Sequence, residues 1–272
     1  MNYRHAFHAG NHADVFKHAA LTLVLEHLRQ KPQPFAVLDT HAGLGGYDLT
    51  SDEARRSPEF QGGVAKVFGQ ELASAPAYSR IVAAMNADGL RTYPGSPEIV
   101  RALLRDDDRL MACELHPEDV QVLKARYRQD RRVAVHHRDG YEAIGALLPP
   151  AERRVLVFID PPFEKTDEAE QLVHAVTMGL KRWPVGIFVA WYPIKDGKIG
   201  AALSAAAADF PKALRVEFSP FRWEENSLPG SGLLICNAPW KLDEKLAALC
   251  EELSGRLGNG GGRWTVDQLT PA

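Results

Sequence analysis

Residues 155–163 read VLVFIDPPF, a run of five apolar residues followed by an acid, two prolines and an aromatic residue. A short and nearly continuous apolar run is typical of a strand that is covered on both faces. Proline lacks the N–H group that a sheet requires, so we expect the strand to end near Asp160 and an extended, rigid loop to follow. The stretch therefore predicts a buried strand that presents a carboxylate and an aromatic ring at its carboxyl end.

Similar apolar runs lie on both sides of this strand, and helical patterns separate several of them. Residues 13–28, 117–128 and 168–183 are the helix candidates between or before these runs. Strands that alternate with helices predict an α/β fold with a doubly wound, mostly parallel sheet and helices on both faces. The other expected strands begin at Phe35, Leu110, Val133, Gly186, Leu214 and Gly232.

One connection is longer than a strand–helix–strand unit requires. Asp39 and Glu114 are 75 positions apart, whereas such a unit takes about 30 residues. The excess includes a helical pattern from residue 64 to about residue 86. We expect a single domain over residues 1–272 with a small helical subdomain inserted at about residues 47–95. Two interpretations of this insertion stay open: a decorative addition, or a surface that holds a macromolecular substrate.

Composition narrows the class of protein. The 272 residues are 45% hydrophobic, which is typical of a globular chain, and no apolar run approaches the ~20 residues that span a bilayer. Three unclustered cysteines (Cys113, Cys236 and Cys250) do not suggest a disulfide framework, and they favour a cytoplasmic location. With 32 basic and 35 acidic residues, binding to a nucleic acid would need a local basic patch.

Ligand-binding signals follow three of the expected strands. Residues 39–46 read DTHAGLGG, and glycines there let backbone approach a ligand closely. Glu114 ends the next strand, where an acid can accept two ribose hydroxyls or cap the following helix. The Asp139–Gly140 pair follows another strand and offers an acceptor for an adenine amino group. Together these signals indicate an adenosine-containing cofactor at the carboxyl edge of the sheet.

The loop after residue 159 suits an aromatic amine. The nitrogen of an exocyclic amine is conjugated with its ring and is a poor nucleophile. Hydrogen bonds from its two N–H groups to Asp160 and to the Pro161 carbonyl would draw it toward tetrahedral geometry, and Phe163 would stack on the base, which contributes about 1–3 kcal/mol. The alternative is a proline-rich loop in which Asp160 only caps the next helix.

The Asp160–Phe163 loop resembles the signature [D/N/S]-P-P-[Y/F/W] of the adenine-N6 and cytosine-N4 amino-methyltransferases, with Phe in place of the commoner Tyr. Residues 3–18, YRHAFHAGNHADVFKH, are an unusual segment that carries four of the ten histidines. Together with LDTHAG at 38–43, YPGSP at 93–97 and WYP at 191–193, they resemble the bacterial 23S ribosomal RNA adenine-N6 methyltransferase J family. The resemblance covers essentially the whole chain.

This resemblance implies a class I, Rossmann-like methyltransferase domain that uses S-adenosylmethionine and releases S-adenosylhomocysteine. It implies transfer of the methyl group to N6 of an adenine in 23S ribosomal RNA by a monomer. The cost of extracting a base from its stack separately predicts that RNA with few or no proteins is the better substrate. We expect neither a metal nor a membrane partner. The resemblance assigns catalysis to Asp160 and cofactor contacts to His18, His41, Ser96, Glu114, Asp139, Gly140 and Asp160. It assigns Tyr3 to the substrate, and we add His5, Lys17, Pro161 and Phe163 as substrate-side residues.

Several alternatives stay open. His8, His12 and His18 could hold a metal, although Gly10 and Asn11 interrupt a helix between them. The same loop chemistry would suit a DNA adenine-N6 methyltransferase, and the chain could also be a non-catalytic RNA-binding assembly factor. The expected RNA contacts are Arg4, Lys17, Arg29 and Lys31 near the N-terminus, and Arg55, Arg56 and Lys66 in the insertion.

Overall fold

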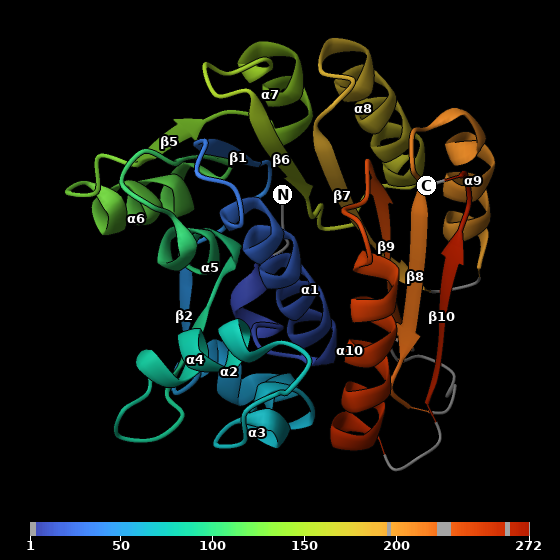
Figure 1. The fold of residues 1–272 in the computed structure, drawn as a ribbon. Helices are drawn as coiled ribbons and strands as arrows, with labels where there is room; N and C mark the ends of the chain where they lie inside the picture. Colours follow the sequence, from blue (N-terminus) through green and yellow to red (C-terminus); the bar gives the residue numbers. More distant parts are fainter. Residues whose placement is uncertain (1–3, 195–196, 222–229, 259–261, 272) are drawn as a thin grey trace.

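The computed structural model describes residues 4–194, 197–221, 230–258 and 262–271. They contain an eight-stranded sheet with the strand order β10-β8-β9-β7-β6-β1-β4-β5 (Figure 1). The strands are β1 (Phe35–Asp39), β4 (Arg109–Glu114), β5 (Val133–His137), β6 (Arg154–Ile159), β7 (Ile187–Ile194), β8 (Leu214–Ser219), β9 (Gly230–Cys236) and β10 (Arg263–Gln268).

Strand directions confirm the predicted α/β fold with a mostly parallel sheet. The neighbours β5, β4, β1, β6 and β7 pair in parallel, whereas β9 runs antiparallel between β7 and β8. The last strand, β10, runs antiparallel to β8. Trp264 and Val266 alternate toward the core and hold this edge strand in place.

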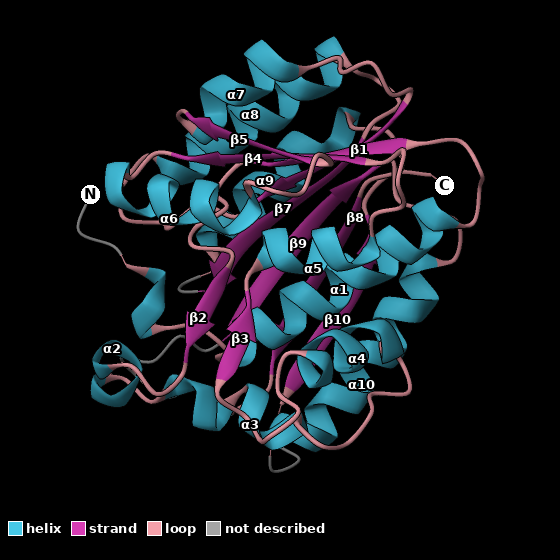
Figure 2. Ribbon diagram, turned by 90° about the vertical axis from the view of Figure 1, so that its left-hand side faces the viewer, coloured by secondary structure: helices cyan, strands magenta, loops and turns pink. Residues whose placement is uncertain are grey.

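Helices cover both faces of the sheet (Figure 2). The helices α7, α8 and α9 pack on one face, and their apolar residues form one of the two core clusters with the strands. The helices α1, α5 and α10 pack on the other face. Their bounds are α1 (His12–Arg29), α5 (Ser96–Leu103), α7 (Gly140–Leu147), α8 (Glu168–Arg182), α9 (Lys198–Ala206) and α10 (Leu242–Leu257).

The first long helix is buried along most of its length. It begins at His12 because the Asn11 side chain caps it, accepting a hydrogen bond from the Asp14 N–H at 2.9 Å. Beyond its first turns it is apolar on nearly every side, since α5 and α10 flank it and the sheet lies beneath. In the described part of the chain, no helix combines the length and the apolar character that crossing a membrane requires.

The segment between β1 and α5 is less helical than the sequence suggests. It opens and closes with a two-stranded antiparallel ribbon, β2–β3. The helical pattern from residue 64 breaks into α3 and α4, because Gly69 adopts φ +79° and Pro76 starts a new helix. The elements are β2 (Gly46–Asp48), α2 (Asp52–Arg56), the 3₁₀ turn η2 (Glu59–Gly62), α3 (Val64–Val67), α4 (Pro76–Ala84) and β3 (Thr92–Pro94).

Candidate active site

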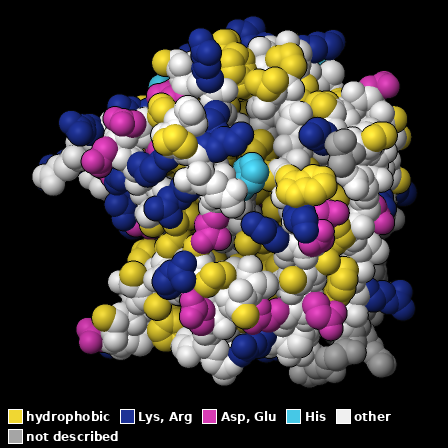
Figure 3. Space-filling view, in the orientation of Figure 1, with side chains coloured by type: hydrophobic (Ala, Val, Ile, Leu, Met, Phe, Trp, Pro, Cys, Tyr) yellow, Lys and Arg dark blue, Asp and Glu magenta, His cyan; other side chains and the backbone are white. Residues whose placement is uncertain are grey.

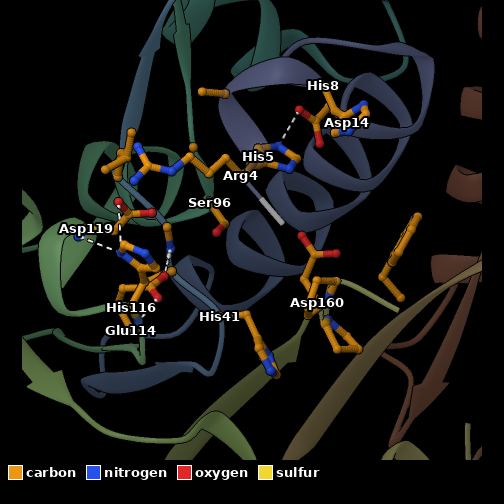
Figure 4. A pocket seen from close by; sticks show the side chains of 18 of the residues that line it. Arg4, His5, His8, Asp14, His41, Ser96, Glu114, His116, Asp119 and Asp160 are labelled. Atoms are coloured by element: carbon orange, nitrogen blue, oxygen red, sulfur yellow. Dashed lines mark hydrogen bonds and ion pairs between the residues drawn. The ribbon is translucent and has the colours of Figure 1, made fainter. Parts of the chain in front are cut away.

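A cavity of about 940 Å³ opens where β1, β4, β5 and β6 end (Figure 4). Its other walls come from the turn η1 (His5–Phe7), from the first turns of α1 and from the start of α5. Tyr3 lies outside the described residues. The other sequence-predicted site residues all line this cavity: His5, Lys17, His18, His41, Ser96, Glu114, Asp139, Gly140, Asp160, Pro161 and Phe163.

Glu114 lies at the end of β4 and faces the loop that follows β1. One carboxylate oxygen accepts a hydrogen bond from the Gly43 N–H at 2.8 Å, and the other accepts one from the His116 N–H at 2.7 Å. Burial raises the pKa of Glu114 above its ordinary value. Each oxygen keeps a second lone pair, so the carboxylate can also accept from the hydroxyls of a ligand. Its helix-capping alternative is wrong, because His116 caps α6 (Pro117–Tyr127).

The junction between β5 and α7 packs directly on the loop after β1. The Asp139 carboxylate caps α7, accepting hydrogen bonds from the backbone N–H groups of Tyr141 and Glu142. A Cβ on Gly140 would lie 2.2 Å from the Thr40 carbonyl oxygen, so only glycine permits this close approach. The His41 ring lies edge-on to Tyr141, and burial lowers the pKa of His41 to about 4, which keeps the imidazole neutral.

A buried lysine joins the N-terminal helix to the loop after β6. The Lys17 ammonium lies 2.7 Å from Asp160 Oδ2 and 2.7 Å from Asp14 Oδ1. Only 5% of the Lys17 side chain and 12% of the Asp160 side chain are exposed. Burial works against the charge of Lys17, but the two carboxylates outweigh it and raise the pKa of Lys17 above its usual range. The alternative role of Asp160 as a helix cap is wrong, because Asp167 precedes α8.

Asp14 is the second support of this charge network. Its carboxylate accepts a hydrogen bond from the Gly10 N–H at 2.8 Å and lies 2.9 Å from His5 Nε2. Burial opposes its charge, yet His5 and Lys17 hold the pKa of Asp14 well below its ordinary value. The sequence carried a signal for this role, since Asp14 and Lys17 are three residues apart on a helix that is otherwise largely apolar.

Two aromatic rings form the wall beside Asp160. Phe163 adopts φ +49°, a left-handed conformation that costs a bulky residue about 1–3 kcal/mol and that clusters at functional sites. Its ring meets Trp191 edge to face, with the centroids 5.8 Å apart. Lys17 Nζ lies 5.1 Å from the centroid of Trp191. The backbone after β6 is therefore held in a strained conformation that turns Phe163 toward the cavity.

The N-terminal histidines have separate partners. His8 contacts Glu59, His12 packs edge-on against Phe221, and the His18 ring nitrogen hydrogen-bonds to the Tyr93 hydroxyl at 2.9 Å. Burial lowers the pKa of His18 to about 3, so its ring is neutral where it lines the cavity. Across the described ranges, no group of three or more His, Cys, Asp or Glu residues is arranged to hold a metal ion.

The fold and this acidic, glycine-lined cavity define a class I methyltransferase that depends on S-adenosylmethionine. The model of the family described as "Ribosomal RNA large subunit methyltransferase D, RlmJ" matches residues 32–270, and the chain belongs to this family. This membership confirms the resemblance seen in the sequence.

Relatives match along the whole chain. Ribosomal RNA large subunit methyltransferase J of Escherichia coli (strain K12) is 38% identical over 278 residues, which cover 100% of this chain and 99% of the relative. The protein of the same name from Haemophilus influenzae is 38% identical over 282 residues, with the same coverage. The crystal structure of protein LPL1258 from Legionella pneumophila is similar with a TM-score of 0.89 and 31% identity, covering 96% of this chain and 98% of that one.

Asp39, which sequence reasoning did not place in the site, ends β1 beneath the cavity. Its carboxyl is fully buried, and the Ser96 side chain and the His41 backbone N–H lie near it and lower its pKa in part. Burial raises the pKa of Asp39 to about 7, and the nearby carboxylates of Asp160 and Glu114 add to this effect. The sequence could not reveal this residue, because an acid at a strand end looks the same whether it is buried or exposed.

Asp39→Asn tests the ionisation of this carboxyl. An unfolded Asp releases its proton near pH 4, whereas folded Asp39 keeps it until about pH 7, so stability declines as pH rises between these values. Asn has the same shape and cannot ionise. We expect the Tm of the variant, relative to the native chain, to rise progressively from pH 5 to pH 8 in thermal unfolding. Asp107→Asn, at an exposed position, should give a flat difference, and a flat difference for Asp39→Asn would contradict this assignment.

Proposed function

We propose that this protein transfers a methyl group from S-adenosylmethionine to N6 of an adenine in 23S ribosomal RNA. The observation that carries the proposal is the position of Asp160. Lys17 holds this carboxylate at the start of the Asp-Pro-Pro-Phe loop, in the same cavity as Glu114 and Asp139. The names of the two bacterial relatives, both large subunit ribosomal RNA methyltransferases, support the choice of RNA.

The residues present fit the cofactor. The cavity has the size of a site for a nucleotide-sized ligand, and Glu114 and Asp139 line it at the ends of neighbouring strands. Glu114 would accept hydrogen bonds from the ribose, Asp139 would face the adenine, and Ser96 with His18 and His41 would complete the pocket. When bound, S-adenosylmethionine supplies an electrophilic methyl group for direct, in-line transfer.

Asp160 and Pro161 would prepare the target amine. The Asp160 carboxylate and the Pro161 carbonyl oxygen would each accept one N–H of the exocyclic group, which frees the nitrogen lone pair for attack. The amine becomes acidic only as its nitrogen forms the new bond, so Asp160 acts first as a hydrogen-bond acceptor. Catalysis in this scheme comes from positioning and preorganised acceptors rather than from a strong base. Lys17 is a positioning residue, since its ammonium fixes the Asp160 carboxylate.

The aromatic wall would hold the base. Phe163 follows Pro161 by two positions and lines the cavity, so its ring can stack on an adenine that has left its helix. Extracting a base from a stack costs a few kcal/mol, and this cost is smallest where the RNA is unpaired. We therefore expect ribosomal RNA that carries few or no proteins to be a better substrate than an assembled subunit.

A methyl-transfer assay with matched substrates tests the proposal. Purified protein and labelled S-adenosylmethionine are incubated with deproteinised 23S RNA, with assembled large subunits and with DNA of equal adenine content. Mass spectrometry of the digested nucleosides should show N6-methyladenosine from the deproteinised RNA and less from the subunits. Preferential methylation of DNA would favour a DNA methyltransferase, and cofactor binding without transfer to any substrate would favour an assembly factor.

Asp160→Ala should abolish transfer without unfolding the protein. The variant removes the proposed acceptor of the amine, while Asp14 still compensates the charge of Lys17. We expect kcat to fall by more than about 100-fold, as is usual for preorganised hydrogen-bonding groups. The Tm should fall as well, because Lys17 loses one of its two buried partners, but the chain should stay folded at the assay temperature. Activity near that of the native protein would remove Asp160 from the mechanism.

Phe163→Ala should weaken the binding of RNA more than the binding of the cofactor. Loss of one stacking contact corresponds to about 1–3 kcal/mol, or a roughly 5- to 150-fold rise in KM for RNA. Calorimetry should meanwhile give an unchanged affinity for S-adenosylmethionine. Phe163→Leu is the control for side-chain volume, and it should resemble the alanine variant if stacking matters. Unchanged RNA kinetics in both variants would rule out the stacking role.

A further inference from the structure

The strongest local concentration of positive charge in the chain extends from the second half of α6 to the residue that follows β5. Six of the fifteen residues from 124 to 138 are Lys or Arg and one is acidic, although the whole chain has a net charge of −3. Figure 3 shows Lys and Arg side chains gathered on the left of the view, where Figure 1 places these two elements. We call this surface the α6–β5 basic face, and it comprises the exposed side chains of Lys124, Arg126, Arg128, Arg131 and Arg138.

Acidic groups in this region already have other partners. Glu118 pairs with Arg4, Asp119 lies beside His116, and Asp130 pairs with Arg132. Asp139, the last acid of the segment, caps α7. Within the described residues the five cations of the α6–β5 basic face form no ion pair with an acid. Their charge is therefore exposed without an internal counter-charge.

These cations also lower the pKa of a neighbouring side chain, that of His136. His136 lies on β5, at the open edge of the sheet. Burial lowers its pKa, and the charges of Arg138 and Lys124 lower it further. Arg138 and Lys124 therefore lie close enough to β5 to act on one of its side chains, and a cluster of such cations attracts a polyanion.

The basic face begins at the rim of the cavity. His116 and Asp119, at the start of α6, line the cavity themselves. Arg126 packs over residues 40–46, the glycine loop that follows β1, since a Cβ on Gly46 would lie 2.9 Å from its guanidinium. Gly46 also lines the cavity. From this rim the eleven residues of α6 extend about 16 Å, a length comparable to several nucleotides of an RNA strand.

We propose that the α6–β5 basic face binds the phosphate backbone of the RNA next to the adenine that enters the cavity. The inference rests on the proposed function, and it replaces most of the N-terminal contacts expected from the sequence. Lys17 is buried between two carboxylates, and Arg4 is paired with Glu118. Arg29 and Lys31 lie at the C-terminal end of α1, whereas the first turns of this helix line the cavity. Exposed arginines and lysines in an array suit phosphates, which need charge and donors but no base-specific geometry.

These charges could also serve a second role, which predicts a different result. Charged side chains beside an edge strand, such as Arg131 before β5 and Arg138 after it, can prevent sheets from pairing edge to edge. If this were their sole purpose, neutralising them would promote aggregation and leave RNA affinity unchanged. The two roles can thus be separated by measurement.

The triple variant Lys124→Gln, Arg128→Gln, Arg131→Gln tests the proposal, and it leaves Arg126 and the glycine loop untouched. Binding of deproteinised 23S RNA is measured between about 50 and 200 mM salt. We expect affinity to fall at least about tenfold at the low-salt end, and the slope of log affinity against log salt to become shallower by about 2–3. KM for RNA should rise, while the affinity for S-adenosylmethionine in calorimetry should not change.

The matched control is a triple variant that removes the same charge from exposed positions away from the cavity lining: Arg153→Gln, Lys181→Gln, Lys245→Gln. It should bind RNA as the native protein does. An unchanged affinity and slope in the α6–β5 variant, or an equal loss in the control, would overturn the proposal. Failure of the native protein to methylate the RNA would instead count against the proposed function, so the two failures can be told apart.

Discussion

A single buried ammonium sets the geometry of the site. Lys17 brings a charge into a region where burial disfavours it, and two carboxylates at 2.7 Å repay that cost. One of them belongs to the same helix, whereas the other follows β6, more than 140 residues later in the chain. The pairing thus ties the loop after β6 to the N-terminal helix, and the aromatic wall of Phe163 and Trp191 is built around it.

Strands and site residues differ in how far the sequence reveals them. The apolar runs identified the seven long strands before β10, because a strand covered on both faces needs apolar side chains throughout. The β2–β3 ribbon escaped notice, since three residues are too few to show a pattern. In the insertion, the pattern at residues 64–86 predicted one continuous helix, but Gly69 and Pro76 divide it into two.

The site was foreseeable where a motif follows a strand, as at Asp160 and Asp139. Burial and ion pairing could not be foreseen, because they depend on residues that are distant in sequence. From the sequence alone Lys17 is indistinguishable from an unpaired cation, and Asp39 from an exposed loop residue. The structure pairs Lys17 with Asp160 and buries Asp39. The basic face was overlooked for another reason: its charges lie on α6, between α6 and β5, and directly after β5, so no single element carries the pattern.

The burial of α1 also bears on biosynthesis. This helix is made more than 200 residues before one of the helices that cover it, α10, which begins at residue 242. Its apolar sides must stay exposed, or be shielded by a chaperone, until α10 has also been made. Completion of the charge network is delayed in the same way until residue 160 has emerged, so the nascent chain cannot assemble this centre early in translation.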